Sequence, residues 1–136
     1  MTQATAPFDF EQARFNMVEQ QIRPWEVLDS RVLALFARIA RENFVPSAHR
    51  LLAFADLEIP LSHGAVMLAP KVQARMVQDL DLQASDNVLH IGTGSGFSAA
   101  LLGTLSKSVL SLEIHPDLAE TARANLSAAG IDNVTV

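Results

Sequence analysis

Hydrophobic residues in the first part of the chain recur every three or four positions, which is the spacing of one face of an α-helix. Phe15, Val18 and Ile22 follow this spacing and predict a first helix over residues 9–22. Pro24 lacks a backbone N–H and stops a helix from continuing, so we expect this helix to end near it. The chain therefore begins with an amphipathic helix that faces a core.

Two further helices and an irregular stretch follow. Asp29 or Ser30 suits the cap of a second amphipathic helix, which stops before residue 44. Residues 44–70 keep no period and contain several prolines, so we expect a loop with one or two short strands. Pro70 fits the first turn of a third helix, over residues 70–82, because an N–H is not needed there.

The last third of the chain alternates short apolar runs with helical patterns. The predicted order is a strand at 88–91, a helix at 97–106, a strand at 108–113, a helix from His115-Pro116-Asp117 to Gly130, and a strand that begins at Asn133. Strands that alternate with helices favour a parallel sheet with right-handed crossovers. The sequence therefore predicts an α/β, Rossmann-like, doubly wound fold.

This order divides the chain into a helical segment with its loop, residues 1–82, and a β-α-β-α-β unit, residues 83–136. Both belong to one domain. Complete doubly wound sheets have about five or more strands, so we expect an incomplete fold and a chain that is the amino-terminal part of a longer protein. An unpaired sheet edge is compatible with a homodimer.

The composition excludes several classes of function. No run approaches the roughly 18 to 20 apolar residues of a membrane span, and the amino terminus has no signal-peptide pattern, so we expect a cytoplasmic protein without a membrane partner. The net charge is −5 and the ten basic residues are scattered, which argues against a nucleic-acid partner. Cysteine is absent and no cluster of metal ligands stands out, so we expect no metal.

The most informative stretch is the glycine-rich turn between the first strand and its helix. Three glycines alternate with two hydroxyl residues: Gly92, Thr93, Gly94, Ser95 and Gly96. Glycines allow a sharp turn and a close approach of the backbone to a ligand, and we expect amides at the start of the helix to point at that ligand. The pattern is typical of a nucleotide-like cofactor site.

A carboxylate at the end of the second strand indicates which cofactor binds. Glu113 follows Gly92 by about 20 residues, where doubly wound folds place the acid that binds ribose hydroxyls. The spacing is G-x-G-x-G and not the G-x-G-x-x-G of dinucleotide sites, which favours S-adenosylmethionine (SAM) over NAD. A purely structural turn with a surface glutamate stays open.

Several motifs in one order resemble the protein-L-isoaspartate O-methyltransferase family. They are Met17-Val-Glu-Gln20, Asp29 with Val32-Leu33, Arg41-Glu-Asn-Phe44-Val-Pro46, Ala53-Phe-Ala-Asp56, Pro60-Leu-Ser-His-Gly64 and Val88-Leu-His-Ile-Gly-Thr-Gly-Ser-Gly96. The resemblance covers residues 17–136. It implies a SAM-binding, seven-stranded doubly wound fold and methylation of the abnormal carboxylate of isoaspartyl residues in damaged proteins.

The resemblance also implies an active-site loop, and this loop differs here. Family members carry serine or threonine hydroxyls after the glycine that matches Gly64, at positions where this chain has Val66 and Leu68. Methyl transfer to a carboxylate depends on positioning and electrostatics, so the loss of oriented donors should impair it. His63 is a candidate to approach the acceptor, and a solvated loop histidine is the alternative.

Two other histidines lie near the predicted cofactor site. His90 stands where SAM-dependent methyltransferases usually have an acid that organises the methionine end of the cofactor. A neutral imidazole accepts a hydrogen bond, whereas a protonated one repels the cationic cofactor, so we expect weaker or pH-dependent SAM binding. His115 either borders the ribose or adenine or simply begins a helix.

Three functions therefore stay open. The first is a SAM-dependent methyltransferase that acts on a protein or peptide carboxylate. The second is a non-catalytic SAM-binding or protein-binding module, which the apolar residues 65–69 favour. The third is an NAD-linked oxidoreductase, for which only the generic strand, glycine turn and acid speak.

Overall fold

The structure is a computed structural model, and it describes residues 6–136. The helices are α1 (Phe10–Met17), α2 (Ser30–Arg38), α3 (Pro70–Leu80), α4 (Phe97–Leu105) and α5 (Pro116–Ala128), and the strands are β1 (Ile59–Pro60), β2 (Val66–Met67), β3 (Asn87–Ile91), β4 (Ser108–Leu112) and β5 (Val134–Thr135). Every helix and strand expected from the hydrophobic pattern is present among these residues. The part of the 1–82 segment before residue 6 lies outside the described residues.

Each of the first two helices begins at an aspartate whose carboxylate accepts from a backbone N–H. Asp9 caps α1 by accepting from the Gln12 backbone N–H at 3.0 Å, and Asp29 caps α2 by accepting from the Arg31 N–H at 2.8 Å. Helical backbone continues after α1 through a π-helical turn at Val18–Ile22 and a 3₁₀ turn at Arg23–Trp25. The helical backbone ends at Trp25, one residue after Pro24, so the predicted end near this proline is confirmed.

The irregular segment between α2 and α3 contains the expected short strands and also 3₁₀ turns. β1 and β2 pair antiparallel, with Ile59 opposite Met67, and enclose a tight turn at Ser62–Gly64.

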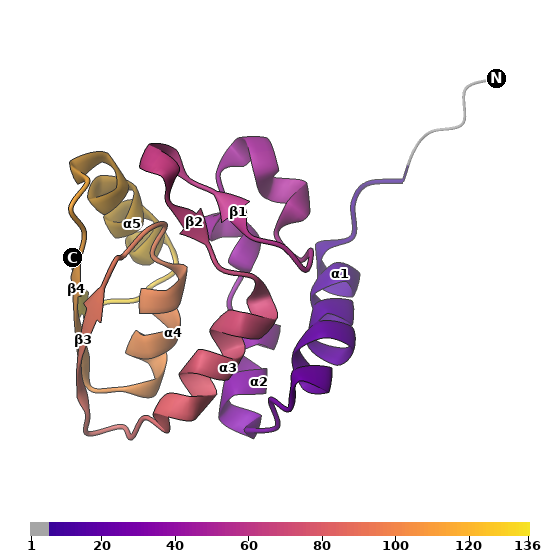
Figure 1. The fold of residues 1–136 in the computed structure, drawn as a ribbon, viewed down its shortest axis with the longest axis horizontal. Helices are drawn as coiled ribbons and strands as arrows, with labels where there is room; N and C mark the ends of the chain where they lie inside the picture. The colour runs from indigo at the N-terminus through magenta and orange to yellow at the C-terminus, as the bar shows by residue number, and fades with distance from the viewer. Residues whose placement is uncertain (1–5) are drawn as a thin grey trace.

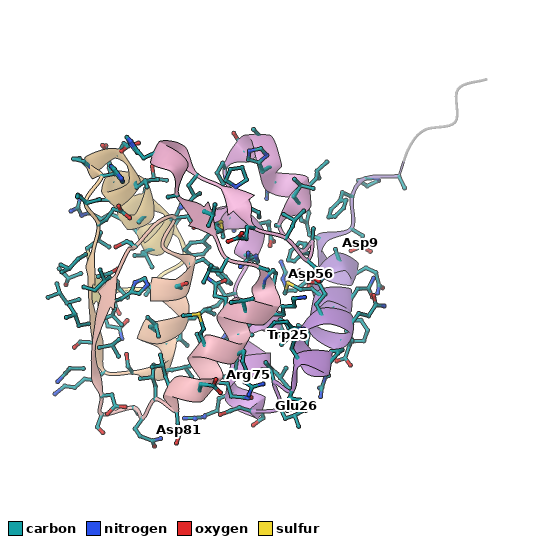
Figure 2. The ribbon with its side chains drawn as sticks, in the orientation of Figure 1. Asp9, Trp25, Glu26, Asp56, Arg75 and Asp81 are labelled. Carbon is teal, nitrogen blue, oxygen red and sulfur yellow. The ribbon has the colours of Figure 1, made fainter. Side chains whose placement is uncertain are left out.

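Asp81 ends α3 in the left-handed conformation, with φ of 46°. Figure 2 shows Trp25 and Arg75 close together, where Arg75 Nη1 on α3 donates to the Trp25 carbonyl at 3.1 Å. This hydrogen bond joins the end of the 3₁₀ turn Arg23–Trp25 to α3.

The main sheet is parallel and has the order β3-β4-β5. β3 and β4 pair from Asn87 opposite Ser108 to Ile91 opposite Leu112. In Figure 1 the sheet is seen edge-on at the left, with α4 beside it and α3, α2 and α1 successively farther to the right. The fold class predicted from the sequence is confirmed. A homodimer through a free sheet edge stays a prediction.

The two faces of this sheet differ sharply. Val109 and Ser111 point toward α4 and are buried. The alternate residues form an apolar face that no described helix covers: Leu89 and Ile91 are 63% and 68% exposed, and Leu110 and Leu112 are about half exposed. The described residues therefore build one covered face of an α/β sheet.

One core joins the helical segment to the β-α-β-α-β unit. Phe97, the first residue of α4, contacts Phe36 of α2 and Phe44 edge to face, with ring centroids 5.7 and 5.4 Å apart. Because Phe97 directly follows the glycine turn, this packing fixes the turn against the helical segment. No helix within residues 6–136 is long and apolar enough to cross a membrane.

Candidate functional site

The glycine turn has the backbone that its sequence predicts. Gly92, Gly94 and Gly96 have φ values of 92°, 57° and 93°, in the region that favours glycine. A Cβ at Gly96 would lie 3.3 Å from Ala122 on α5, so this glycine also allows close packing of two helices. A Cβ at Gly92 would meet no atom within 4 Å and would instead fill open space above the turn.

Four amides of the turn are bonded within the chain, and the expectation that amides at the start of the following helix point at a ligand stays a prediction. The N–H groups of Gly92 and Thr93 donate to the Leu112 carbonyl at 2.8 and 3.2 Å, and that of Gly96 donates to the Thr93 carbonyl at 3.0 Å. The Gly94 N–H donates to Glu113 Oε1 at 2.8 Å. These four amides are therefore not free donors, and the glycines of the turn offer a ligand a backbone surface without side chains.

Glu113 directly follows β4, and its carboxylate is held by two backbone groups. Oε1 accepts from Gly94 N–H, and Oε2 accepts from His115 N–H at 3.1 Å. Since an ionised carboxylate offers about four lone-pair sites, both oxygens keep capacity for further donors. Glu113, Gly92 and Ile114 lie beside a hollow of about 430 Å³ at the carboxyl ends of β3 and β4. Ligands of open α/β sheets bind at this end.

A second cavity, of about 280 Å³, lies on the other side of Gly92, between the β1–β2 segment, α3 and the start of α4. The predicted site residues His90, Gly92, Thr93, Gly94 and Ser95 line it, and so do Val66 and Leu68. The structure thus brings the glycine turn and the expected active-site loop together around one cavity. Gly96 lines neither hollow, because it faces α5.

His90 lies at the floor of this cavity in a hydrogen-bonded chain. Its Nδ1 is 2.8 Å from Ser111 Oγ, which is fully buried and lies 2.6 Å from Thr93 Oγ1. Burial lowers the pKa of His90 below its ordinary value, although the nearby carboxylate of Glu113 acts in the opposite direction. His90 is therefore neutral at pH 7, the form that accepts a hydrogen bond from a cationic ligand.

His63 and His115 lie outside both hollows and contact each other. Their rings stack with centroids 3.9 Å apart and planes within 2°. His63 Nε2 is 2.7 Å from Asp117 Oδ1, and the Ser62 hydroxyl donates to Asp117 Oδ2 at 3.0 Å. The His63 hydrogen bond is the main cause that lowers the pKa of Asp117. Since the Glu113 carboxylate also binds the His115 N–H, this cluster links the loop to the segment after β4.

Three polar residues near the cavity were not predicted as site residues from the sequence, although Arg41 begins one of the motifs that carry the family resemblance. Gln73 on α3 and Ser98 on α4 line it, and Arg41, which is 1% exposed, lies behind Gln73 and donates to it. Polar residues on amphipathic helices ordinarily indicate a solvated face. For Ser98 the sequence signal was its position, two residues after Gly96 in the first turn of the helix.

Comparison with known proteins agrees with this geometry. The sequence profile described as protein-L-isoaspartate(D-aspartate) O-methyltransferase matches residues 12–136. Proteins named protein-L-isoaspartate O-methyltransferase from Methanoculleus marisnigri and Aeropyrum pernix are each 42% identical to this chain. The matches cover 90% and 92% of this chain but 56% and 49% of the relatives. The chain therefore spans about half the length of the curated relatives it matches.

Two solved structures have the same fold. A protein-L-isoaspartate O-methyltransferase superposes with a TM-score of 0.70 at 23% identity, over 93% of this chain and 40% of its own. A putative protein-L-isoaspartate O-methyltransferase from Plasmodium falciparum, in complex with S-adenosyl-L-homocysteine, gives 0.67 at 20% identity, over 94% and 62%. With the profile match over most of its length, this chain belongs to the protein-L-isoaspartate(D-aspartate) O-methyltransferase family.

Proposed function

We propose that this chain binds SAM and serves in a protein-L-isoaspartate O-methyltransferase, which transfers a methyl group to the abnormal carboxylate of isoaspartyl residues. The observation that carries this proposal is the position of the glycine turn between two hollows, with Glu113 beside one and a neutral His90 in the other. The family membership supports the same reaction and removes the reason to consider an NAD-linked oxidoreductase.

The chemistry of the site fits SAM. Glu113 would accept from the ribose hydroxyls with the lone pairs that its two backbone bonds leave free. His90 would accept from the ammonium of the methionine end, and Gly92 would let the cofactor pass between the hollows without meeting a Cβ. When bound, SAM supplies an electrophilic methyl group on a sulfonium. The role of the chain is to hold both partners and to exclude water.

The acceptor carboxylate would enter the cavity of about 280 Å³ between the loop and α3. Leu61, Val66 and Leu68 form its apolar wall, and Met76 and Leu80 line it from α3. An apolar wall removes water from the carboxylate, which raises its reactivity and also makes each oriented donor important. The proposed acceptor is therefore a single peptide carboxylate and not a large polar surface.

A variant of Glu113 tests the cofactor site. Glu113→Ala removes the proposed acceptor of the ribose hydroxyls, and two lost charge-assisted hydrogen bonds should weaken S-adenosylhomocysteine binding on the order of 100-fold. Glu120→Ala, at an exposed position on α5, is the matched control. Isothermal titration of both variants measures the effect. Equal affinity in the two variants would contradict the assignment of Glu113.

The reaction itself is tested with methyl-labelled SAM and two peptides that differ only in one linkage, isoaspartyl or aspartyl. Label on the isoaspartyl peptide alone would support the proposed reaction. A specific observation also favours a second function: Val66 and Leu68 place no hydroxyl in the cavity. If the chain binds S-adenosylhomocysteine but transfers no label to either peptide, it is a non-catalytic SAM-binding module.

A further inference from the structure

Three polar side chains, joined by hydrogen bonds, extend from the protein interior to the cavity of about 280 Å³ that would receive the acceptor carboxylate, which we call the acceptor cavity. Arg41 belongs to the 3₁₀ turn Arg41–Phe44, Gln73 to α3 and Ser98 to the first turn of α4. Arg41 Nη1 donates to Gln73 Oε1 at 2.6 Å, and Gln73 Nε2 donates to Ser98 Oγ. Arg41 and Gln73 are buried, whereas Ser98 is partly exposed and lines the cavity.

The chemistry of arginine fixes the donor and the acceptor in both hydrogen bonds between these three side chains. A guanidinium only donates, so the Gln73 carbonyl oxygen must face Arg41. The Gln73 NH₂ must then face Ser98, whose oxygen accepts. The proton of the Ser98 hydroxyl is consequently not used in this bond. Thr104 on the same helix differs, because its hydroxyl donates to the Ala100 carbonyl at 2.9 Å.

We propose that the Ser98 hydroxyl donates to the acceptor carboxylate and that Arg41 and Gln73 are positioning residues that direct its proton into the cavity. This inference rests on the proposed function. Ser98 shares the cavity with Val66 and Leu68, where the loop offers no hydroxyl. The first turn of α4 thus supplies the donor that the loop lacks.

The charge of Arg41 strengthens this assignment. Its three hydrogen bonds go to neutral oxygens: the Ala53 carbonyl at 2.8 Å, Gln73 Oε1, and the Leu68 carbonyl at 2.9 Å. A buried cation bonded only to neutral oxygens polarises the hydrogen bonds that run through Gln73 to Ser98. It therefore favours an anion beside the Ser98 hydroxyl. Its bond to the Leu68 carbonyl also occupies an acceptor of the loop, which would otherwise repel a carboxylate.

The first test measures binding of an isoaspartyl peptide to the chain saturated with S-adenosylhomocysteine. Ser98→Ala should weaken peptide binding on the order of 10- to 100-fold, the value of a hydrogen bond to a charged group. Affinity for S-adenosylhomocysteine should not change. Ser98→Thr keeps the hydroxyl and should retain peptide affinity, and Thr104→Ala is the control for a hydroxyl lost elsewhere on α4. Unchanged peptide affinity in Ser98→Ala would overturn the inference.

A second variant removes the donor without removing the hydroxyl. In Gln73→Glu the new carboxylate accepts from both Arg41 and Ser98, so the Ser98 proton turns away from the cavity while the buried guanidinium gains an ion pair. We expect the fold to stay at least as stable and peptide affinity to fall. Adding Ser98→Ala to this variant should then lower peptide affinity by less than about 3-fold. Full additivity of the two losses would show that the new charge acts alone and would overturn the inference.

These outcomes are separable from failure of the proposed function. If the unaltered chain binds no S-adenosylhomocysteine, the proposed function fails and the inference fails with it. If the unaltered chain binds both ligands and Ser98→Ala binds them equally well, only the role of Ser98 is overturned.

Discussion

Replacement of Arg41 by methionine should destabilise the fold more than any surface substitution. Arg41 is 1% exposed, and it joins three parts of the molecule by donating to the Ala53 carbonyl, to Gln73 and to the Leu68 carbonyl. Its guanidinium also lies 4.9 Å from the ring centroid of Phe97. Methionine has a similar length and no donor, so Arg41→Met isolates the polar contribution of this residue.

The expected magnitude follows from two opposing terms. Three hydrogen bonds from a charged donor contribute about 4 to 9 kcal/mol, because each is worth roughly 1.5 to 3 kcal/mol. Burial lowers the pKa of Arg41 from its ordinary value to about 10, which corresponds to a cost of about 3 kcal/mol for keeping the cation in the interior. Methionine removes that cost along with the bonds. The net loss in the free energy of unfolding should therefore be about 1 to 6 kcal/mol.

Urea denaturation, followed by circular dichroism and by the fluorescence of the single tryptophan Trp25, measures this loss. Arg38→Met, at an exposed position at the end of α2, is the matched control and should change stability by less than about 0.5 kcal/mol. The loss in Arg41→Met should be the same from pH 6 to pH 8, since a pKa of about 10 leaves Arg41 protonated throughout. A loss below about 1 kcal/mol would refute the reasoning, because buried carbonyls without donors cost more than that.

Three further predictions concern the turn and the histidines. Gly96→Ala should destabilise the fold by about 1 to 3 kcal/mol more than Gly130→Ala in urea denaturation, since both have positive φ but only Gly96 lies against a neighbouring helix; equal losses would show that this contact is soft. SAM affinity should be constant from pH 7 to 8 and fall with decreasing pH below about 6.5, because protonation of His90 through its lowered pKa places a cation beside the cofactor; a flat titration from pH 5 to 8 contradicts this. Asp117→Asn should be less stable than the unaltered chain above about pH 4, because the ionised carboxylate of Asp117 bonds His63. The difference should vanish as pH falls through the lowered pKa of Asp117. A difference in acid-dependent unfolding that persists at pH 2 argues against this bond.

The periodicity of apolar residues was sufficient to predict the elements of the fold. Capping residues such as Asp29 and the glycine turn gave boundaries within about two residues, as such local signals usually do. The pattern was less informative for α3, where Met76 and Leu80 occupy apolar positions at helical spacing but are 57% and 56% exposed. They line the acceptor cavity, and hydrophobic periodicity does not distinguish a core from the wall of a binding site.

Contacts between distant parts of the chain could not be predicted from local patterns. Burial of Arg41 depends on carbonyls that the irregular segment turns toward it, and neither the hydrophobic pattern nor the motif that begins at Arg41 indicates this burial. The stacking of His63 on His115 joins a loop to a helix cap more than fifty positions later. That the glycine turn and Glu113 lie together could be predicted from the sequence, because one local β-α-β unit sets their spacing.

The central claim is that the glycine turn and Glu113 bind the adenosyl cofactor, and titration of this chain with S-adenosylhomocysteine at pH 7.5 tests it most directly. A pair of leucine variants gives the control: Gly92→Leu would fill the space above the turn, whereas Gly130→Leu imposes a similar positive-φ strain away from the site. The account predicts binding of one molecule per chain in the micromolar range, loss of binding in Gly92→Leu and retention in Gly130→Leu. No binding by the unaltered chain, or equal binding by both variants, would contradict it.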